Sequence, residues 1–176
     1  IVTPGRQRDR QHEYSVDVEG TANVLKACLA ANVRQIIVTS SGAAYGYHAD
    51  SPALLEEDHP LRGNPEFAYA DHKRLVEEML ARYRSDYPQL QQLIFRPGTV
   101  LGAQTNNQIT DLFRKRFVLG ITGATSPWVF IWDEDVLECL VKGIEERATG
   151  IYNLAGDGAL PMAQIAQRLG KPYLPL

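Results

Sequence analysis

The chain has 176 residues, of which 44% are hydrophobic and 22% charged, a composition typical of a globular protein with one continuous core. Its formal net charge of −3 gives no long-range attraction for nucleic acid, and we interpret the basic cluster Arg114-Lys115-Arg116 as a solvated helix face. No stretch approaches the roughly 20 apolar residues that span a bilayer, and the N-terminus lacks the residue order of a signal peptide. We therefore expect a cytoplasmic protein that binds neither nucleic acid nor membrane.

Cysteine and histidine are few and scattered. Cys28 and Cys139 each lie in a segment with helical apolar spacing, which favours buried thiols over a disulfide. No two histidines show a paired spacing such as H-x-x-x-H, so we expect no metal site. The histidines are His12, His48, His59 and His72, and His59 is predicted to lie in a polar loop.

The first half of the chain predicts two long helices around one strand and a loop. Apolar spacing predicts a helix over residues 12–31, followed by a β-branched strand at 35–39 that is typical of burial on both faces of a parallel sheet. Residues 43–65 lack periodicity and form a long loop, a kind of segment that tends to be functional. Asn64-Pro65 predicts a helix start, since Asn caps free amides and Pro suits the first position. That helix should end near residue 83 or 85, with a core stripe of Leu75, Val76, Met79, Leu80 and Tyr83.

The second half alternates short strands with helices. Strands are predicted at 93–95, 129–131 and 151–154, a turn at 96–102, and helices at 108–119 and 134–147. In the last helix Glu138 and Lys142 form an exposed pair, and the predicted inner face consists of Val136, Leu137, Leu140, Val141 and Ile144. This alternation predicts an α/β fold with a mainly parallel sheet.

Tyr69 and Lys73 are the first candidates for chemistry. They lie four residues apart in a predicted helix, so both project from one face. A phenol, with a reference pKa of about 10, is a poor base at neutral pH, but a nearby ammonium stabilises the phenolate. Ser41 follows the strand at 35–39, and ligands of open parallel sheets bind beyond the carboxyl ends of strands. A Ser41 hydroxyl can donate to a substrate oxygen there, whereas Ser40 is predicted only to cap the turn.

Several motifs together resemble one family. The order T-S-S-G-A-A-Y-G at 39–46, Y-A-D-H-K at 69–73 and R-P-G-T-V-L-G at 96–102 resembles the extended short-chain dehydrogenase/reductase family, also called the NAD-dependent epimerase/dehydratase family. Segments 16–25, 130–136 and 150–155 are similar to further parts of that family. The resemblance implies a Rossmann-like, doubly wound fold, present here in part. Residues 1–102 would form the cofactor-binding part with the catalytic residues, and residues 103–176 substrate-binding elements and returning strands rather than an independent domain.

The resemblance also implies roles for named residues. Tyr69 would be the general base or acid, Lys73 would hold the nicotinamide ribose, and Ser41 would bind the reacting oxygen of a secondary alcohol or ketone. A sugar or a sugar nucleotide would be such a substrate. Thr39 and Pro97 would lie beside the cofactor, either NAD or NADP. The residues implied at the substrate are Ser41, Thr99, Asn107 and Trp128.

The chain departs from the family pattern at several positions. It contains no G-x-G-x-x-G or G-x-x-G-x-x-G phosphate loop, and we expect Ile1-Val2 to be the fourth strand of a longer fold whose first part precedes this sequence. Activity of the 176 residues alone is therefore not expected. Asp17 stands where the family usually has Asn. Gly42-Ala43 replaces the Asp-Glu pair of family dehydratases, which disfavours 4,6-dehydration. Thr99 replaces an Asn, and the region of Trp128 lacks an Arg that grips a diphosphate, so a nucleotide-sugar substrate stays open.

The alternatives to an NAD(P)-dependent epimerase or dehydrogenase are of two kinds. One is a cofactor-binding regulator or scaffold that has kept the fold without catalysis. The other, a serine hydrolase, is disfavoured because Ser41 lacks the G-x-S-x-G elbow and a histidine base. Relatives often assemble as pairs, so we expect a homodimer through helices 12–31 and 64–83.

Overall fold

The computed structural model describes residues 10–106, 108–123 and 127–176. The predicted strand Ile1-Val2 and the predicted substrate residue Asn107 lie outside these ranges. Within them, no helix combines the length and the hydrophobicity that crossing a membrane would require.

The predicted first helix is one helical run with a wider turn in its middle. It consists of α1 (Arg10–Tyr14), the π-helical turn η1 (Ser15–Glu19) and α2 (Gly20–Ala30). The apolar spacing did not indicate the π turn, in which the Gly20 N–H bonds the carbonyl of Ser15. Val18 and Leu25 are the buried residues of the run. The run ends before Asn32, whose φ of 54° is left-handed.

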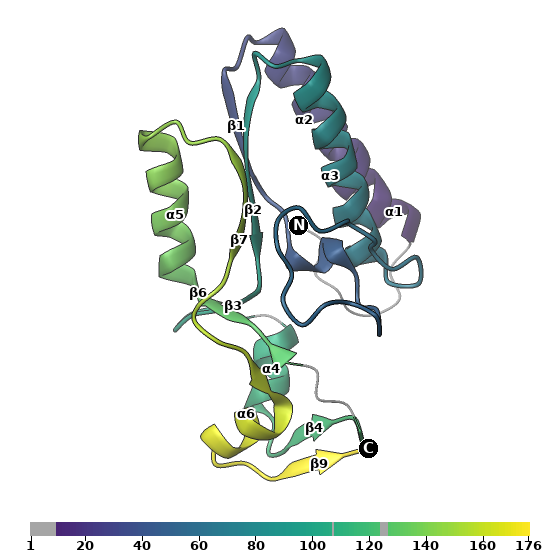
Figure 1. Cartoon of the computed structure of the whole chain (residues 1–176), viewed down its shortest axis with the longest axis vertical. Helices are drawn as coiled ribbons and strands as arrows, with labels where there is room; N and C mark the ends of the chain where they lie inside the picture. The colour runs from purple at the N-terminus through teal and green to yellow at the C-terminus, as the bar shows by residue number, and fades with distance from the viewer. Residues whose placement is uncertain (1–9, 107, 124–126) are drawn as a thin grey trace.

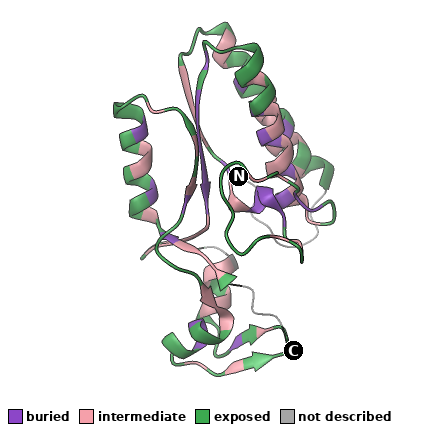
Figure 2. Ribbon diagram, in the orientation of Figure 1, coloured by how far each residue is buried: buried purple, intermediate pink, exposed green. Residues whose placement is uncertain are grey.

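A three-stranded parallel sheet confirms the predicted α/β class. Its strands are β1 (Gln35–Thr39), β2 (Gln91–Pro97) and β7 (Gly150–Leu154), in the order β1-β2-β7. The central strand β2 is buried from residue 92 to 97, and Figure 2 shows buried residues along it. The prediction that β1 is buried on both faces is wrong for the described residues, because β1 pairs only with β2 there and is half-buried.

Helices cover both faces of this sheet. In Figure 1, α2 and α3 (Ala68–Asp86) lie on one side of the strands and α5 (Asp133–Glu145) on the other. The predicted stripe of α3 is confirmed, since its apolar residues pack with α2 and β2 into one core cluster. The buried members of that cluster are Val18, Leu25, Val76, Leu80, Leu90 and Ile94. A second cluster under α5 contains Leu93, Phe95, Ile131, Val136 and Leu154.

The predicted start of α3 at Asn64-Pro65 is wrong, because the helix begins at Ala68. Asn64 is buried, and its amide instead clamps the main chain of Tyr47: Oδ1 accepts from the Tyr47 N–H at 2.7 Å and Nδ2 donates to the Tyr47 carbonyl at 3.3 Å. The cross-loop bonds outweigh the local capping preference, so Asn64 anchors the loop rather than the helix.

The apolar stripe of α5 is narrower than predicted. Val136 is buried and Leu140 packs against the sheet, but Leu137, Val141 and Ile144 are exposed. The inner face includes Cys139 and Gly143 instead. A Cβ atom added to Gly143 would lie only 2.4 Å from the Leu93 side chain, so the helix and the sheet approach closely there. The predicted Glu138–Lys142 pair is replaced by Lys142 with Glu146, at 3.9 Å.

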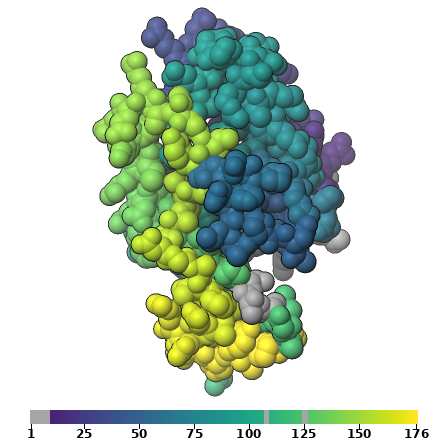
Figure 3. Space-filling view, in the orientation of Figure 1, coloured from purple at the N-terminus to yellow at the C-terminus, as the bar shows by residue number. Residues whose placement is uncertain are grey.

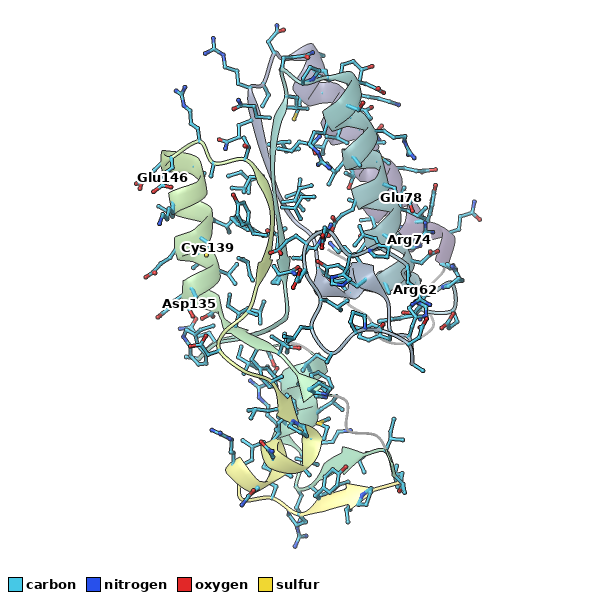
Figure 4. The ribbon with its side chains drawn as sticks, in the orientation of Figure 1. Arg62, Arg74, Glu78, Asp135, Cys139 and Glu146 are labelled. Carbon is cyan, nitrogen blue, oxygen red and sulfur yellow. The ribbon has the colours of Figure 1, made fainter. Side chains whose placement is uncertain are left out.

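Both cysteines are free and half-buried, as members of helices. Figure 4 labels Cys139 on α5, and this residue packs against the second core cluster. The prediction of thiols without a disulfide is therefore confirmed, although neither thiol is fully buried.

The remaining elements form a smaller part below the sheet in Figure 1. It contains β3 (Thr99–Leu101) paired with β6 (Phe130–Trp132), β4 (Val118–Gly120) with β9 (Tyr173–Pro175), β5 (Pro127–Trp128) with β8 (Leu160–Pro161), and the helices α4 (Gln108–Arg114) and α6 (Met162–Arg168).

Three predictions for this part need correction. The predicted turn at 96–102 contains the end of β2 and the short strand β3, because each finds a parallel partner. The predicted helix at 108–119 ends at Arg114, since Val118 pairs with Tyr173 in β4. The predicted strand at 129–131 is interrupted at Val129. The basic cluster at 114–116 is exposed as expected, but only Arg114 lies on the helix, so its prediction as a helix face is wrong for Lys115 and Arg116.

Candidate active site

The predicted pair Tyr69 and Lys73 lies in the first two turns of α3. Lys73 Nζ is 5.7 Å from the centroid of the Tyr69 ring, so the two side chains share one face of the helix. Both residues are half-buried. The Phe67 ring lies 6.0 Å from that of Tyr69, and the Tyr47 ring lies 6.1 Å from that of Phe67. The phenol therefore sits in an aromatic row at the start of the helix.

Ser41 follows β1 and caps a short 3-10 turn, η2 (Gly42–Tyr45). Its Oγ accepts from the Ala43 N–H at 3.1 Å. The turn packs against α3, and a Cβ added to Gly42 would lie 3.5 Å from the Pro97 carbonyl oxygen. The turn that Ser41 caps thus lies between the end of β2 and the helix that carries Tyr69. The capping role predicted for Ser40 belongs to Ser41, because Ser40 is buried and donates to Glu77 at 2.5 Å.

Lys73 occupies a site where burial and carboxylates oppose each other. Burial lowers the pKa of Lys73 from its ordinary value, and the carboxylates of Asp17 and Glu77 act in the opposite direction. Within the described part of the chain, the ammonium makes no hydrogen bond or ion pair. Among the described residues, its N–H donors beside Tyr69 are thus not taken up by another side chain or main-chain group.

A buried ion pair joins α3 to β2 next to this pair. The side chains of Arg96 and Glu77 are only 3% and 2% exposed, and Arg96 Nη2 lies 2.6 Å from Glu77 Oε2. Arg96 Nε lies 3.0 Å from each carboxylate oxygen. Burial disfavours the charged guanidinium, but the bonds to Glu77 outweigh it and raise the pKa of Arg96. Each charge is thus stabilised chiefly by the other.

The same guanidinium holds the turn η2 and the loop that follows it. Arg96 Nη1 donates to the Tyr45 hydroxyl at 2.7 Å and to the Glu57 carbonyl at 3.0 Å. The guanidinium carbon also lies 4.8 Å from the centroid of the Tyr45 ring. We call Ser40, Tyr45, Glu77 and Arg96 the guanidinium hub. It connects the ends of β1 and β2 with η2 and α3.

Asn153 of β7 extends these contacts along the loop. Its Oδ1 lies 2.8 Å from the Tyr45 hydroxyl, its Nδ2 donates to the Leu55 carbonyl at 2.9 Å, and its N–H donates to Glu57 Oε1 at 2.7 Å. In the space-filling view the loop forms part of the visible surface beside the yellow-green segment of β7 (Figure 3). The middle of the long loop is therefore fixed by hydrogen bonds from Arg96 and Asn153.

The other predicted site residues are spread over the sheet end and the smaller part. Thr39 ends β1 and is exposed, and Pro97 ends β2 and is buried. Thr99 begins β3, where its N–H donates to the Val129 carbonyl at 2.9 Å. Trp128 stacks on Phe130 at 6.3 Å and meets Phe113 edge-on at 5.9 Å. The structure thus brings Tyr69 and Lys73 together on one face of α3, and it places the turn that follows Ser41 beside α3 and the end of β2.

Two cavities lie in the smaller part of the chain. The larger, about 430 Å³, lies between β3, α4 and α6, and it is lined by Phe113, Phe130, Leu160 and Ile165 among others. The smaller, about 220 Å³, lies beside β6 and the turn at 156–158. None of the predicted catalytic residues lines either cavity.

Sequence reasoning missed the residues of the guanidinium hub other than Ser40. Glu77 follows Lys73 by four residues, as Lys73 follows Tyr69, and this repeated spacing was an available signal. Arg96 ends an apolar strand, where an unpaired charge would be costly, so a buried partner could have been expected. Asn153 had no signal in its local sequence.

Comparison with known proteins agrees with this architecture. The sequence model of the NAD dependent epimerase/dehydratase family matches residues 3–155. An N-acetyl-alpha-D-glucosaminyl-diphospho-ditrans,octacis-undecaprenol 4-epimerase from Escherichia coli O157:H7 is 28% identical over 90% of this chain and 49% of its own length. A 3-diazoavenalumate denitrifying reductase from a Streptomyces species is 29% identical over 88% of this chain and 52% of its own. The chain therefore spans about half the length of these curated relatives.

Solved structures share the fold. UDP-glucose 4-epimerase of Thermus thermophilus, in complex with NAD, superposes with a TM-score of 0.74 at 24% identity, over 93% of this chain and 58% of that one. A short-chain dehydrogenase/reductase superfamily protein of Agrobacterium tumefaciens with bound NAD gives 0.75 at 22% identity, over 100% and 66%. With the family match over residues 3–155, the parallel sheet and the motifs in order, the chain belongs to the NAD dependent epimerase/dehydratase family.

Proposed function

We propose that this chain is the catalytic part of an NAD(P)-dependent oxidoreductase or epimerase that transfers hydride at a secondary alcohol or ketone carbon. The observation that carries the proposal is the Tyr69–Lys73 pair, with Nζ 5.7 Å from the phenol ring, beside the end of a parallel sheet where Ser41 and Pro97 also lie. Membership in a family of NAD-dependent epimerases and dehydratases supports the same reaction type.

The side chains present suit the nicotinamide half of such a cofactor. Lys73 offers ammonium donors without a bonding partner in the described residues, and ribose hydroxyls are suitable acceptors. Thr39 and Pro97 end neighbouring strands, which is where ligands of open parallel sheets bind. The sequence contains no glycine-rich phosphate loop, so these residues account for one half of the site only. When bound, the nicotinamide would accept a hydride from the substrate carbon and return it.

Each of the three polar side chains has a separate task in the proposed reaction. Tyr69 takes the hydroxyl proton of the substrate when the alcohol is oxidised and gives it back in the reverse direction. Lys73, one turn away, stabilises the phenolate formed in that step. Ser41 donates to the reacting oxygen, and its position is set by the capping bond to Ala43.

We propose a sugar or sugar nucleotide as the substrate class, bound by elements of residues 103–176 against the catalytic part, residues 1–102. The Escherichia coli relative named above acts on a lipid-linked sugar diphosphate, which supports this class. Ser41, Thr99, Asn107 and Trp128 are the proposed contacts. Gly42 and Ala43 provide no acid or base, so 4,6-dehydration is disfavoured.

The test is hydride transfer by the complete protein with and without the phenol. In Tyr69→Phe we expect the rate of nicotinamide reduction by candidate alcohols to fall by roughly 10²–10⁴-fold, because the proton acceptor is lost. Tyr83→Phe is the matched control, since Tyr83 lies on the same helix but packs on Tyr87. Equal rates in wild type and Tyr69→Phe would refute catalysis by this site and favour a cofactor-binding regulator.

We also propose a homodimer through helices 12–31 and 64–83. Apolar side chains on the first of these helices support it, since Tyr14, Val16 and Val24 are exposed.

A further inference from the structure

Asp17 has a side chain directed at α3, the helix that carries Tyr69 and Lys73. It lies in the π turn η1, and its main-chain carbonyl already accepts from the Thr21 hydroxyl at 2.6 Å. Its carboxylate is only 14% exposed, and Oδ2 lies 3.4 Å from Nδ1 of His72 on α3. The carboxylate, rather than the carbonyl, is therefore the part of Asp17 that reaches α3.

His72 holds this carboxylate in place. The imidazole is 2% exposed and precedes Lys73 directly in the chain. The Tyr14 ring of α1 meets it edge-on, with centroids 5.7 Å apart and an interplanar angle of 80°. With a proton on Nδ1, the ring donates to Asp17, and its packing against Tyr14 leaves it little freedom to turn. An aspartate and a histidine thus face each other across the helices at the level of Lys73.

Among the described residues, Asp17 is not paired with an arginine or a lysine. Of the two carboxylates that favour the charged form of Lys73, Glu77 is already paired with Arg96 at 2.6 Å. Asp17 has no arginine or lysine in salt-bridge contact within the described residues, and its ion-pair neighbour there is His72. Its carboxylate therefore acts on Lys73 without an arginine or lysine paired to it in the described residues.

Other charged groups on the packed elements are engaged elsewhere or exposed. Asp71 pairs with Arg10 of α1 at 3.3 Å and with Arg74 of α3 at 2.8 Å, and Arg74 also holds Glu78. On η1 the other carboxylate is Glu19, which is exposed. α1 also carries the titratable side chains of His12, Glu13 and Tyr14.

We propose that Asp17 is a positioning residue for the proposed reaction, and that its carboxylate, fixed by His72, keeps Lys73 as an ammonium beside Tyr69. Lys73 is half-buried, and burial alone favours loss of its proton. A neutral amine would not stabilise a phenolate. It would also offer the ribose hydroxyls uncharged donors, which form weaker hydrogen bonds than those of an ammonium. An Asn at position 17 keeps the shape and the main-chain bond to Thr21 but removes this support.

The experiment measures the proton on Lys73 directly. Competitive acetylation with acetic anhydride, read by peptide mass spectrometry from about pH 7 to 11, reports the fraction of neutral amine. In Asp17→Asn we expect labelling of Lys73 near pH 8 to rise about threefold to tenfold, because loss of the carboxylate lowers the pKa of Lys73 further. Exposed Lys142 of the same molecule is the internal reference and should keep its profile.

Matched variants separate this effect from a general loss of charge or of fold. Glu19→Gln removes one negative charge from the same π turn and should change Lys73 labelling by less than about twofold. Asp17→Glu retains the charge and should restore most of the wild-type profile. His72→Leu frees the carboxylate and should raise labelling in the same direction as Asp17→Asn, which keeps the test decisive if Asp17→Asn does not fold.

An identical Lys73 profile in wild type and in either folded variant, Asp17→Asn or His72→Leu, would overturn the proposal. The labelling needs neither cofactor nor substrate, so its result is independent of the Tyr69→Phe comparison. A loss of the proposed function would appear in that comparison, whereas a loss of this inference would appear in the labelling alone.

Discussion

Replacement of Arg96 by methionine provides the sharpest test of the guanidinium hub. The variant removes the contacts of 2.6, 3.0 and 3.0 Å to Glu77 and leaves a carboxylate that is 2% exposed with Ser40 as its remaining bonding partner. Breaking one side of a buried pair costs about 3–5 kcal/mol, since the other charge is left uncompensated. At about 2–4 °C per kcal/mol, the midpoint of thermal unfolding should fall by roughly 6–20 °C.

The assay is urea denaturation of wild type and variant, followed by far-ultraviolet circular dichroism. A buried carboxyl without its cation binds a proton more readily in the folded than in the unfolded chain, so stability of the variant should fall as pH rises. The loss relative to wild type should therefore be smaller near about pH 5 than near about pH 8. The double variant Arg96→Met with Glu77→Met should lose less than the sum of the two single variants.

The control is an ion pair of the same helix that is open to solvent. Arg74 and Glu78 lie side by side on α3 at 2.6 Å, as Figure 4 labels them, and both are partly exposed. Glu78→Met, which leaves Arg74 paired with Asp71 at 2.8 Å, should cost about 0–1 kcal/mol. A loss below about 1 kcal/mol for Arg96→Met, or strict additivity in the double variant, would refute the reasoning that this pair is a mutually dependent buried unit.

Two further predictions concern packing and assembly. Leu80→Ala should lower the free energy of unfolding by about 2–5 kcal/mol because Leu80 is 0% exposed, whereas Leu137→Ala, at 59% exposure, should cost less than about 0.5 kcal/mol; similar losses in denaturation would contradict the observed face of α5. Val24 is 52% exposed, and Val24→Glu places a charge on the apolar surface of the proposed homodimer, so the variant should sediment as a monomer. A wild type that is monomeric at high concentration in sedimentation velocity would contradict the dimer.

Elements with strong periodicity were predictable from sequence. Residues 35–39 form a strand with the bounds expected from their β-branched run, and the stripe containing Val76 and Leu80 packs as its spacing indicated. The spacing of Tyr69 and Lys73 was also sufficient to place both side chains on one face. In each case the signal and the structure depend on residues a few positions apart.

Features that depend on distant partners were not predictable in the same way. Asn64 has the local chemistry of a helix cap, but its amide bonds Tyr47, 17 residues earlier. Val118 continues a helical pattern, yet its partner Tyr173 draws it into a strand. Ile144 fits a helical apolar face, but it is exposed because α5 contacts the core through Val136 and Gly143 instead. Long-range contacts outweighed local preference at all three positions.

The guanidinium hub makes residues of separate segments interdependent in evolution. If Tyr45, Glu77 or Arg96 changed alone, a buried polar group would be left without its partner, so the first replacement would be selected against unless the others followed. Exposed residues of the same loop, such as Leu54, carry no such constraint. In an alignment of homologous chains, these three positions should therefore vary together, whereas exposed residues of the loop should vary independently of them.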